Sequence, residues 1–132
     1  MSKTITQKIT FKNTTPAALF NLYMKAAEHT KVTGAKAEIT AKEGAKFTAY
    51  YDYITGENLK IIKDTLIVQS WRGSDWDEKE ADSTFMLFFE PKGENAVLHV
   101  LHANLPDEHA ESIDKGWHDF YWKPWKKHLS GK

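Results

Sequence analysis

Residues 105–129 read LPDEHAESIDKGWHDFYWKPWKKHL, which is the pattern of one long amphipathic helix. Pro106 suits the first helical turn, where its missing N–H is not needed, and the acidic residues after it suit the positive end of the helix dipole. At about 100° per residue, one face collects most of the apolar side chains. They are Ile113, Trp117, Phe120, Tyr121 and Pro124, with Trp125 at the edge and Trp122 and Leu129 further round. This arc is wider than docking on one face of a sheet requires.

Two residues interrupt the helical pattern. Pro124 removes one backbone hydrogen bond, so we expect a kink near residues 120–124. Gly116 lies inside the helix, where glycine costs about 1 kcal/mol relative to alanine. We interpret Gly116 as a point where the helix closely approaches the structure on which it packs.

The sequence before residue 105 predicts a sheet and two short helices. Residues 4–11 alternate as a strand does, Thr15 and Pro16 begin a helix, and a second helical segment at 26–31 ends at Gly34. Six more strands are predicted at 35–41, 47–53, 59–62, 66–72, 84–89 and 97–103. The order predicts an α+β fold, in which a curved antiparallel sheet of about seven strands grips the C-terminal helix. Residues 1–132 are predicted to form a single domain.

The composition excludes several classes of function. The 132 residues contain 18 basic and 18 acidic side chains, so no overall field favours nucleic acid. There is no cysteine, which excludes disulfides and thiolate chemistry. No run reaches the roughly 20 apolar residues of a membrane span, and the first residues do not form a signal peptide. We therefore expect a cytoplasmic protein.

The sequence predicts no metal site, no cofactor and no catalytic residue. His99 and His102 lie on opposite faces of a predicted strand, and His118 and His128 lie roughly 15 Å apart along the helix. The acidic residues within 75–82 lack the spacing of a calcium loop, so we interpret them as a solvated hairpin loop. There is also no glycine-rich phosphate loop, nucleophile elbow or HExxH motif.

Several stretches together resemble the C-terminal domain of the activator of the heat-shock protein 90 ATPase, a family of the START-like, or helix-grip, superfamily (SRPBCC). These stretches are 66–72 with Trp76, 83–89, Leu105-Pro106, and Gly116-Trp117 with the aromatic residues that follow. The resemblance covers nearly the whole chain. It implies a helix-grip fold and raises heat-shock protein 90 as a partner.

The aromatic residues either fill the space between sheet and helix as a packed core or line a cavity there. A cavity of this kind would take a hydrophobic small molecule, such as a lipid, with one or two orienting hydrogen bonds. The predicted lining consists of Phe47, Tyr51, Phe85, Leu87, Phe89, Leu98, Val100, His102, Trp117, Phe120 and Tyr121. Among these, Tyr51, His102 and Tyr121 would supply the polar groups.

A second candidate site is the outer face of the sheet. The solvent-exposed face of an antiparallel sheet is normally polar, so an apolar outer face indicates a partner protein or a weak homodimer. The predicted interaction surface consists of Met86, Phe88, Val97 and Leu101 on this face, together with Trp122 and Trp125 at the edge of the C-terminal helix.

Three functions follow from these sites. We favour a non-enzymatic domain that binds a hydrophobic ligand. The alternative is a chaperone-associated protein-interaction module of the stress response. A cyclase- or hydratase-type enzyme on the same fold is less favoured, because the sequence places no paired acid and base in the cavity.

Overall fold

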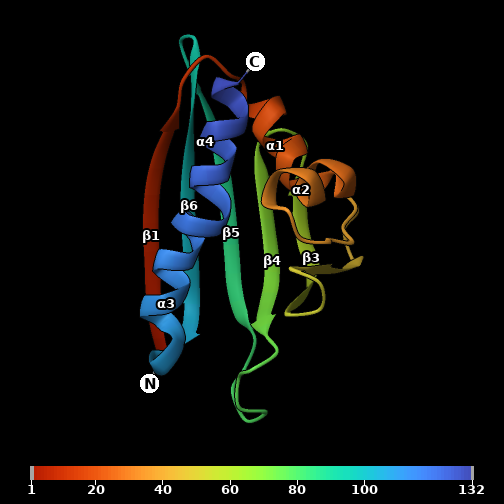
Figure 1. Cartoon of the computed structure of the whole chain (residues 1–132). Coiled ribbons are helices and arrows are strands. Elements are labelled where there is room, and N and C mark those ends of the chain that lie inside the picture. The colour runs from red at the N-terminus through yellow and green to blue at the C-terminus, as the bar shows by residue number, and fades with distance from the viewer. Residues whose placement is uncertain (1, 132) are drawn as a thin grey trace.

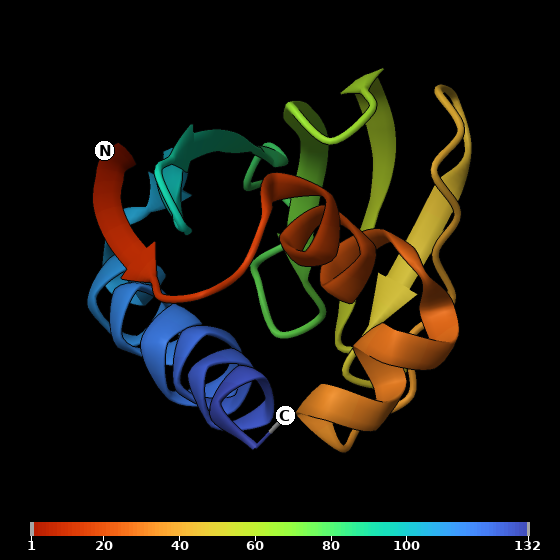
Figure 2. The ribbon, with the colours of Figure 1, turned by 90° about the horizontal axis from the view of Figure 1, so that it is seen from above.

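The computed structural model describes residues 2–131 as a curved antiparallel sheet with helices on its concave side (Figure 1). The elements are β1 (Ser2–Phe11), α1 (Pro16–Met24), α2 (Ala26–Thr33), β2 (Lys46–Ala49), β3 (Ile54–Ile62), β4 (Leu66–Gly73), β5 (Ser83–Lys92), β6 (Asn95–Pro106), α3 (Asp107–Trp117), a π-helical turn η1 (His118–Trp122) and α4 (Lys123–Ser130). The strand order is β1-β6-β5-β4-β3-β2. Figure 2 shows the strands as an arc around the helices. The predicted α+β helix-grip architecture is confirmed.

Within residues 2–131 the sheet has six strands and not the predicted seven, because residues 35–41 form no regular strand. Ala35, Ala37 and Ile39 are each 4% exposed, as their alternation predicts. The segment nevertheless joins the sheet only through an isolated bridge between Glu38 and Thr48. The neighbouring strand β2 has four residues, so it is too short to pair with all of 35–41.

Strand β2 is short because the chain turns earlier than predicted. Tyr50 and Tyr51 have positive φ angles of 48° and 63°, which end the strand after Ala49. The turn expected between the predicted strands 47–53 and 59–62 lies instead at 50–53, and Gly56 belongs to β3. A Cβ atom on Gly56 would lie 1.9 Å from the Ser70 carbonyl oxygen, so this strand position requires glycine.

Helix α1 begins where the sequence predicted, and helix α2 begins and ends as predicted. The Thr15 hydroxyl accepts a hydrogen bond from the Ala18 N–H at 3.2 Å, which caps α1. Helix α2 ends at Gly34, whose φ of 80° is the left-handed conformation that glycine adopts without strain. The pair α1–α2 lies beside the C-terminal helix within the arc of the sheet (Figure 2).

The C-terminal helix forms one wider turn where Pro124 was expected to kink it. The Lys123 N–H donates to the His118 carbonyl oxygen, five residues earlier, which defines the π-helical turn η1. Pro124 has no N–H to donate to the carbonyl oxygen of Phe120, four residues earlier. The hydroxyl of Tyr50 donates to that oxygen instead, at 3.3 Å.

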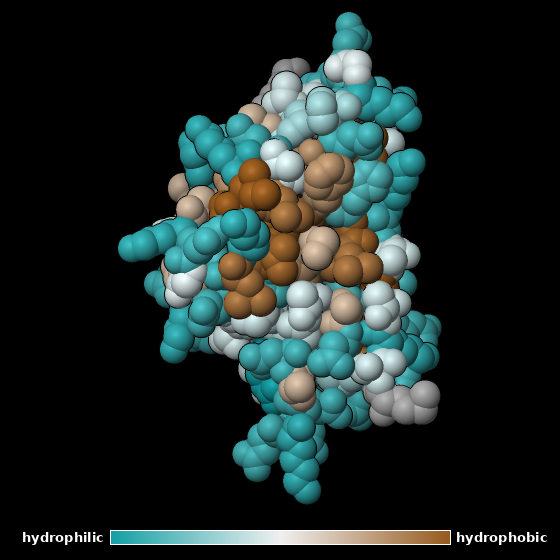
Figure 3. All heavy atoms as spheres, turned by 180° about the vertical axis from the view of Figure 1, so that it is seen from behind, coloured by the Kyte–Doolittle hydropathy of each residue, from teal (hydrophilic) through white to brown (hydrophobic). Residues whose placement is uncertain are grey.

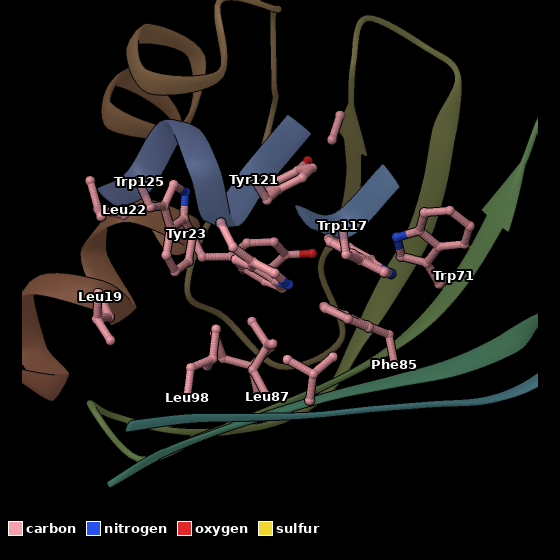
Figure 4. Packing of buried hydrophobic residues seen from close by; sticks show 14 of the residues in the cluster. Leu19, Leu22, Tyr23, Trp71, Phe85, Leu87, Leu98, Trp117, Tyr121 and Trp125 are labelled. Atoms are coloured by element: carbon pink, nitrogen blue, oxygen red, sulfur yellow. The ribbon is translucent and has the colours of Figure 1, made fainter. Parts of the chain in front are cut away.

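The centre of the core is a stack of aromatic rings between the helix and the sheet. Trp117 lies parallel to Phe85, with 4.2 Å between ring centroids and 4° between planes (Figure 4). Trp117 also stacks on Trp122, with 5.5 Å between ring centroids. These contacts fix the rotation of the helix on the sheet, and so decide which of its residues face any pocket.

Candidate functional site

The structure fills the central space that was predicted to be a cavity. Nine of the eleven predicted lining residues are at most 3% exposed. Seven of these nine lie in the packed core and do not line the pocket described below: Phe47, Phe85, Leu87, Phe89, Leu98, Val100 and His102. Figure 4 shows Phe85, Leu87 and Leu98 directly beneath the helix. Tyr51 points to solvent and is 62% exposed, because its positive φ turns the chain away from the sheet. These eight residues therefore lie outside the lining of the pocket described below.

His102 anchors the helix to the sheet. The indole N–H of Trp117 donates to His102 Nδ1 at 3.1 Å, and Nε2 lies 2.7 Å from the Ser83 hydroxyl. An indole nitrogen can only donate, so Nδ1 accepts and Nε2 carries the proton. The Ser83 hydroxyl in turn donates a hydrogen bond to the Trp71 carbonyl oxygen. Burial lowers the pKa of His102 to about 3, so the ring is neutral.

A second buried network, which the sequence did not reveal, centres on His29. Its Nδ1 donates to the Tyr23 carbonyl oxygen at 2.8 Å, and its Nε2 accepts from the Tyr121 hydroxyl at 2.8 Å. Burial lowers the pKa of His29 to about 4. The Tyr23 hydroxyl donates to Gln69, and Gln69 donates to Asn58. Gln69 could have indicated this network from the sequence, since it is a polar residue among the apolar positions of its strand.

A pocket of about 430 Å³ opens beside this packed centre, between the C-terminal helix and the β2–β3 edge of the sheet. Its lining is Tyr50, Tyr53, Ile54, Trp71, Ser112, Ile113, Gly116, Trp117, Phe120 and Tyr121. Trp117, Phe120 and Tyr121 were predicted as lining residues and do line it. The other seven were missed, because the helical pattern shows which side chains face inward but not which edge of the sheet they meet.

The rim of the pocket is made by rings from the helix and from the β2–β3 turn. Phe120 is 55% exposed, and its ring centroid lies 5.5 Å from that of Tyr50. The Tyr50 hydroxyl bond to the Phe120 carbonyl ties these two elements together. Tyr53 forms another part of the rim, and its hydroxyl donates to Asp75 at 2.8 Å. Burial, helped by this bond to Asp75, raises the pKa of Tyr53 to about 12.

Gly116 forms part of the pocket wall. A Cβ atom there would meet the ring of Phe120 at 3.6 and 3.9 Å, which is ordinary van der Waals contact. The interpretation of Gly116 as a point of close helix–sheet approach is therefore wrong. The space next to its Cα belongs to the pocket.

The loop between β4 and β5 closes over one end of the molecule. The Arg72 guanidinium donates to the carbonyl oxygens of Glu80 and Asp77 at 2.6 and 2.7 Å, and it lies 5.8 Å from the Trp76 ring centroid. The acidic loop is thus wrapped around an arginine and is more ordered than a solvated hairpin loop.

Within residues 2–131, no three His, Cys, Asp or Glu side chains gather as metal ligands would. The described helices include none with the length and apolarity to cross a membrane.

The outer face of the sheet carries an apolar patch (Figure 3). Neighbouring strands place its residues side by side in register: Ile62, Leu66 and Phe88 in one row, and Val68, Met86 and Leu101 in the next. We call these six residues the outer patch. Phe88 is 41% exposed and Ile62 is 46% exposed. The prediction of an apolar outer face therefore agrees with the structure at Met86, Phe88 and Leu101.

The other three residues of the predicted interaction surface are buried. Val97 is 1% exposed, between the in-register residues Glu90 and Thr10. Trp122 and Trp125 are 1% and 0% exposed. The indole N–H of Trp122 donates to Gln7 of β1 at 2.6 Å. Assigning these three residues to an exposed surface was wrong.

Comparison with known families and curated proteins agrees with this fold. A family model described as Activator of Hsp90 ATPase homolog 1-like protein matches residues 13–129. A curated relative from Dictyostelium discoideum, Activator of 90 kDa heat shock protein ATPase homolog, is 24% identical over 117 residues. The alignment covers 88% of this chain but 30% of that relative, so the chain spans about a third of the relative's length.

Solved structures include close matches. An HSP90 activator from Plasmodium falciparum is 29% identical, with a TM-score of 0.84 over 98% of this chain and 96% of that one. Protein MLL2253 from Mesorhizobium loti is 13% identical, with a TM-score of 0.82 over 98% of both chains. At that low identity the second likeness shows the fold alone.

Proposed function

The chain belongs to the Activator of Hsp90 ATPase homolog 1-like family, and we propose that it is a non-enzymatic domain that binds a hydrophobic small molecule. The observation that carries this proposal is the pocket of about 430 Å³ between the C-terminal helix and the β2–β3 edge. Its volume lies within the range of small-molecule sites, and such sites are mostly apolar with a few polar groups.

The polar groups of the pocket support a binding role. Tyr53 and Ser112 already donate their hydroxyl protons, to Asp75 and to the His109 carbonyl oxygen. Their oxygens are left to accept one hydrogen bond each from a ligand. Burial of apolar surface would then supply the affinity, and one or two hydrogen bonds would orient the molecule.

The titratable groups near the pocket support binding over catalysis. A general acid or base works best with a pKa near the working pH. The pKa of Tyr53 is raised to about 12, and burial raises the pKa values of Tyr50 and Tyr121 as well. His29 and His102 are neutral, lie outside the lining, and have both ring nitrogens occupied by hydrogen bonds.

Native mass spectrometry of protein purified without denaturation tests the proposal. We expect a fraction of the protein to carry one additional small mass that is lost on collisional activation. The purified protein should also take up the neutral fluorescent probe N-phenyl-1-naphthylamine, with a stoichiometry of one. A Phe88→Lys variant, changed on the opposite face of the sheet, is the matched control and should bind equally. Protein that carries no added mass and takes up no probe would contradict the proposal.

A second candidate function is association with heat-shock protein 90, for which the outer patch would be the contact surface. It is supported by the family match and by the named activity of the Plasmodium falciparum relative. Sedimentation of the chain with purified heat-shock protein 90 tests it. We expect a complex that Phe88→Lys weakens, because a lysine in the patch would lose its hydration on binding. A weak homodimer through the same patch would show as concentration-dependent sedimentation of the chain alone.

A further inference from the structure

Neither the backbone nor the packing requires glycine at position 116. Its φ is not positive, since it lies within the helical segment Asp107–Trp117. A Cβ atom would make only ordinary contacts with the Phe120 ring. Glycine is the poorest helix former after proline, so nearly any other residue would favour the helix. What glycine provides here is space, because every other side chain would extend into the pocket that Gly116 lines.

We propose that the pocket is a site for an uncharged, flat aromatic molecule, and that the missing side chain of Gly116 leaves the space for the ring of that molecule. This inference rests on the proposed binding function and narrows it to one class of ligand. Gly116 is then a specificity-determining residue, since the size of the side chain at this position decides which rings can enter.

The preference for a flat ring follows from the lining. Six of its ten residues are aromatic: Tyr50, Tyr53, Trp71, Trp117, Phe120 and Tyr121. Neighbouring rings are steeply tilted to one another, by 65° for Tyr50 and Phe120 and by 53° for Trp117 and Tyr121. A planar ligand therefore meets both ring faces and ring edges, which are the favoured aromatic geometries. A flexible aliphatic chain gains none of these contacts and loses more conformational entropy on binding.

The preference for an uncharged molecule follows from electrostatics. The lining contains no Asp, Glu, Lys, Arg or His among the residues that the structure describes. A buried ion would thus lack a partner of opposite charge, which is costly. Asp75 lies next to the rim through its bond to Tyr53, and its negative charge further disfavours an anion. Aromatic rings also attract cations, so a quaternary ammonium ion is the main competing ligand and belongs in the test.

The experiment measures N-phenyl-1-naphthylamine fluorescence with the wild type and three variants. Gly116→Ala should weaken binding several-fold while raising the melting temperature by about 3–5 °C, because alanine favours the helix. Gly116→Leu should weaken binding at least tenfold, because its side chain fills the pocket. Lys115→Leu, an exposed neighbour on the same helix, adds the same side chain outside the lining and should leave binding unchanged. Oleate and benzyltrimethylammonium serve as competitors, and neither should displace the probe.

The outcomes separate this inference from the proposed function. Displacement by oleate would show an aliphatic site, and displacement by benzyltrimethylammonium would show a cation site. Either result overturns the aromatic assignment while binding itself stands. A folded Gly116→Leu variant with wild-type affinity would overturn the role of Gly116. If Gly116→Leu does not fold, Gly116→Ala takes its place. A folded alanine variant with wild-type affinity would then overturn the role of Gly116. A wild-type protein that binds none of the three compounds would refute the proposed function and this inference together.

Discussion

Acid should destabilise this protein strongly between pH 7.5 and pH 5, because two buried histidines must gain a proton when the chain unfolds. The folded pKa values are about 4 for His29 and about 3 for His102, against 6.5 for an ordinary histidine. In this range the unfolded chain binds more protons than the folded one, so stability is present above pH 6.5 and is lost as the pH falls. Linkage gives a loss of about 2 kcal/mol for each histidine by pH 5.

Burial lowers both pKa values, and the hydrogen bonds of the two rings differ in how well they tolerate a second proton. A second proton on His102 Nδ1 would face the indole N–H of Trp117, which cannot turn into an acceptor. A second proton on His29 Nε2 would face the Tyr121 hydroxyl, which can rotate and accept. For His29, the hydrogen bond to the Tyr23 carbonyl oxygen also raises the pKa and offsets part of the effect of burial. Together the two histidines should reduce the free energy of unfolding by about 4 kcal/mol, a large part of the usual 5–15 kcal/mol.

Urea unfolding at pH 7.5 and pH 5.0, at constant ionic strength, measures this loss. The window stays above the range in which carboxylates titrate, so the histidines dominate it. A His29→Gln variant should retain about half of the pH dependence, while His118→Gln, at an exposed position, should retain all of it. A wild-type loss below about 1 kcal/mol would refute the reasoning, since it would mean that the rings are hydrated or charged in the folded state.

Three further predictions concern the core, metals and the outer patch. Trp117→Ala should cost about 3–5 kcal/mol in urea melts, since the ring is 3% exposed and stacks on Phe85; a loss under about 1 kcal/mol would contradict the docking of the helix. Adding a chelator should leave the melting temperature unchanged, and a fall that zinc reverses would reveal a metal site. Phe88→Lys should change stability by less than about 0.5 kcal/mol while reducing any self-association seen by sedimentation, and a large destabilisation would show that Phe88 is packed in the core.

The sequence predicted the fold well where a residue's role depends on local periodicity. The alternation of residues 66–72 and 84–89 placed β4 and β5 correctly, and Thr15-Pro16 marked the start of α1. It failed at the β2–β3 turn, because tyrosine rarely adopts a positive φ and nothing local indicates that Tyr50 and Tyr51 do so. That single error lengthened β2 and added the seventh strand.

The candidate site was predicted only in part, for a related reason. The helical pattern assumed a regular α-helix, but η1 is wider, so it rotates its own last residues and those beyond it relative to that pattern. Trp122 and Trp125 therefore turn into the core, although the helical pattern left them at and beyond the edge of the buried face. Trp71 was recognised only as part of a family signature, because its place in the pocket depends on how far the helix lies from the β2–β3 edge.

The places where this chain departs from local preferences gather around the pocket. Among the described residues 2–131, five residues other than glycine have a positive φ, and three of them are asparagine or aspartate, which tolerate that conformation. The other two, Tyr50 and Tyr51, form the turn at the rim. The π-helical turn and the mid-helix Gly116 lie on the opposite wall. Well-folded chains usually satisfy local preferences except at functional sites, where strain is offset by the rest of the structure. The packed aromatic centre provides that offset, and the concentration of strained positions around the pocket supports the proposed binding role.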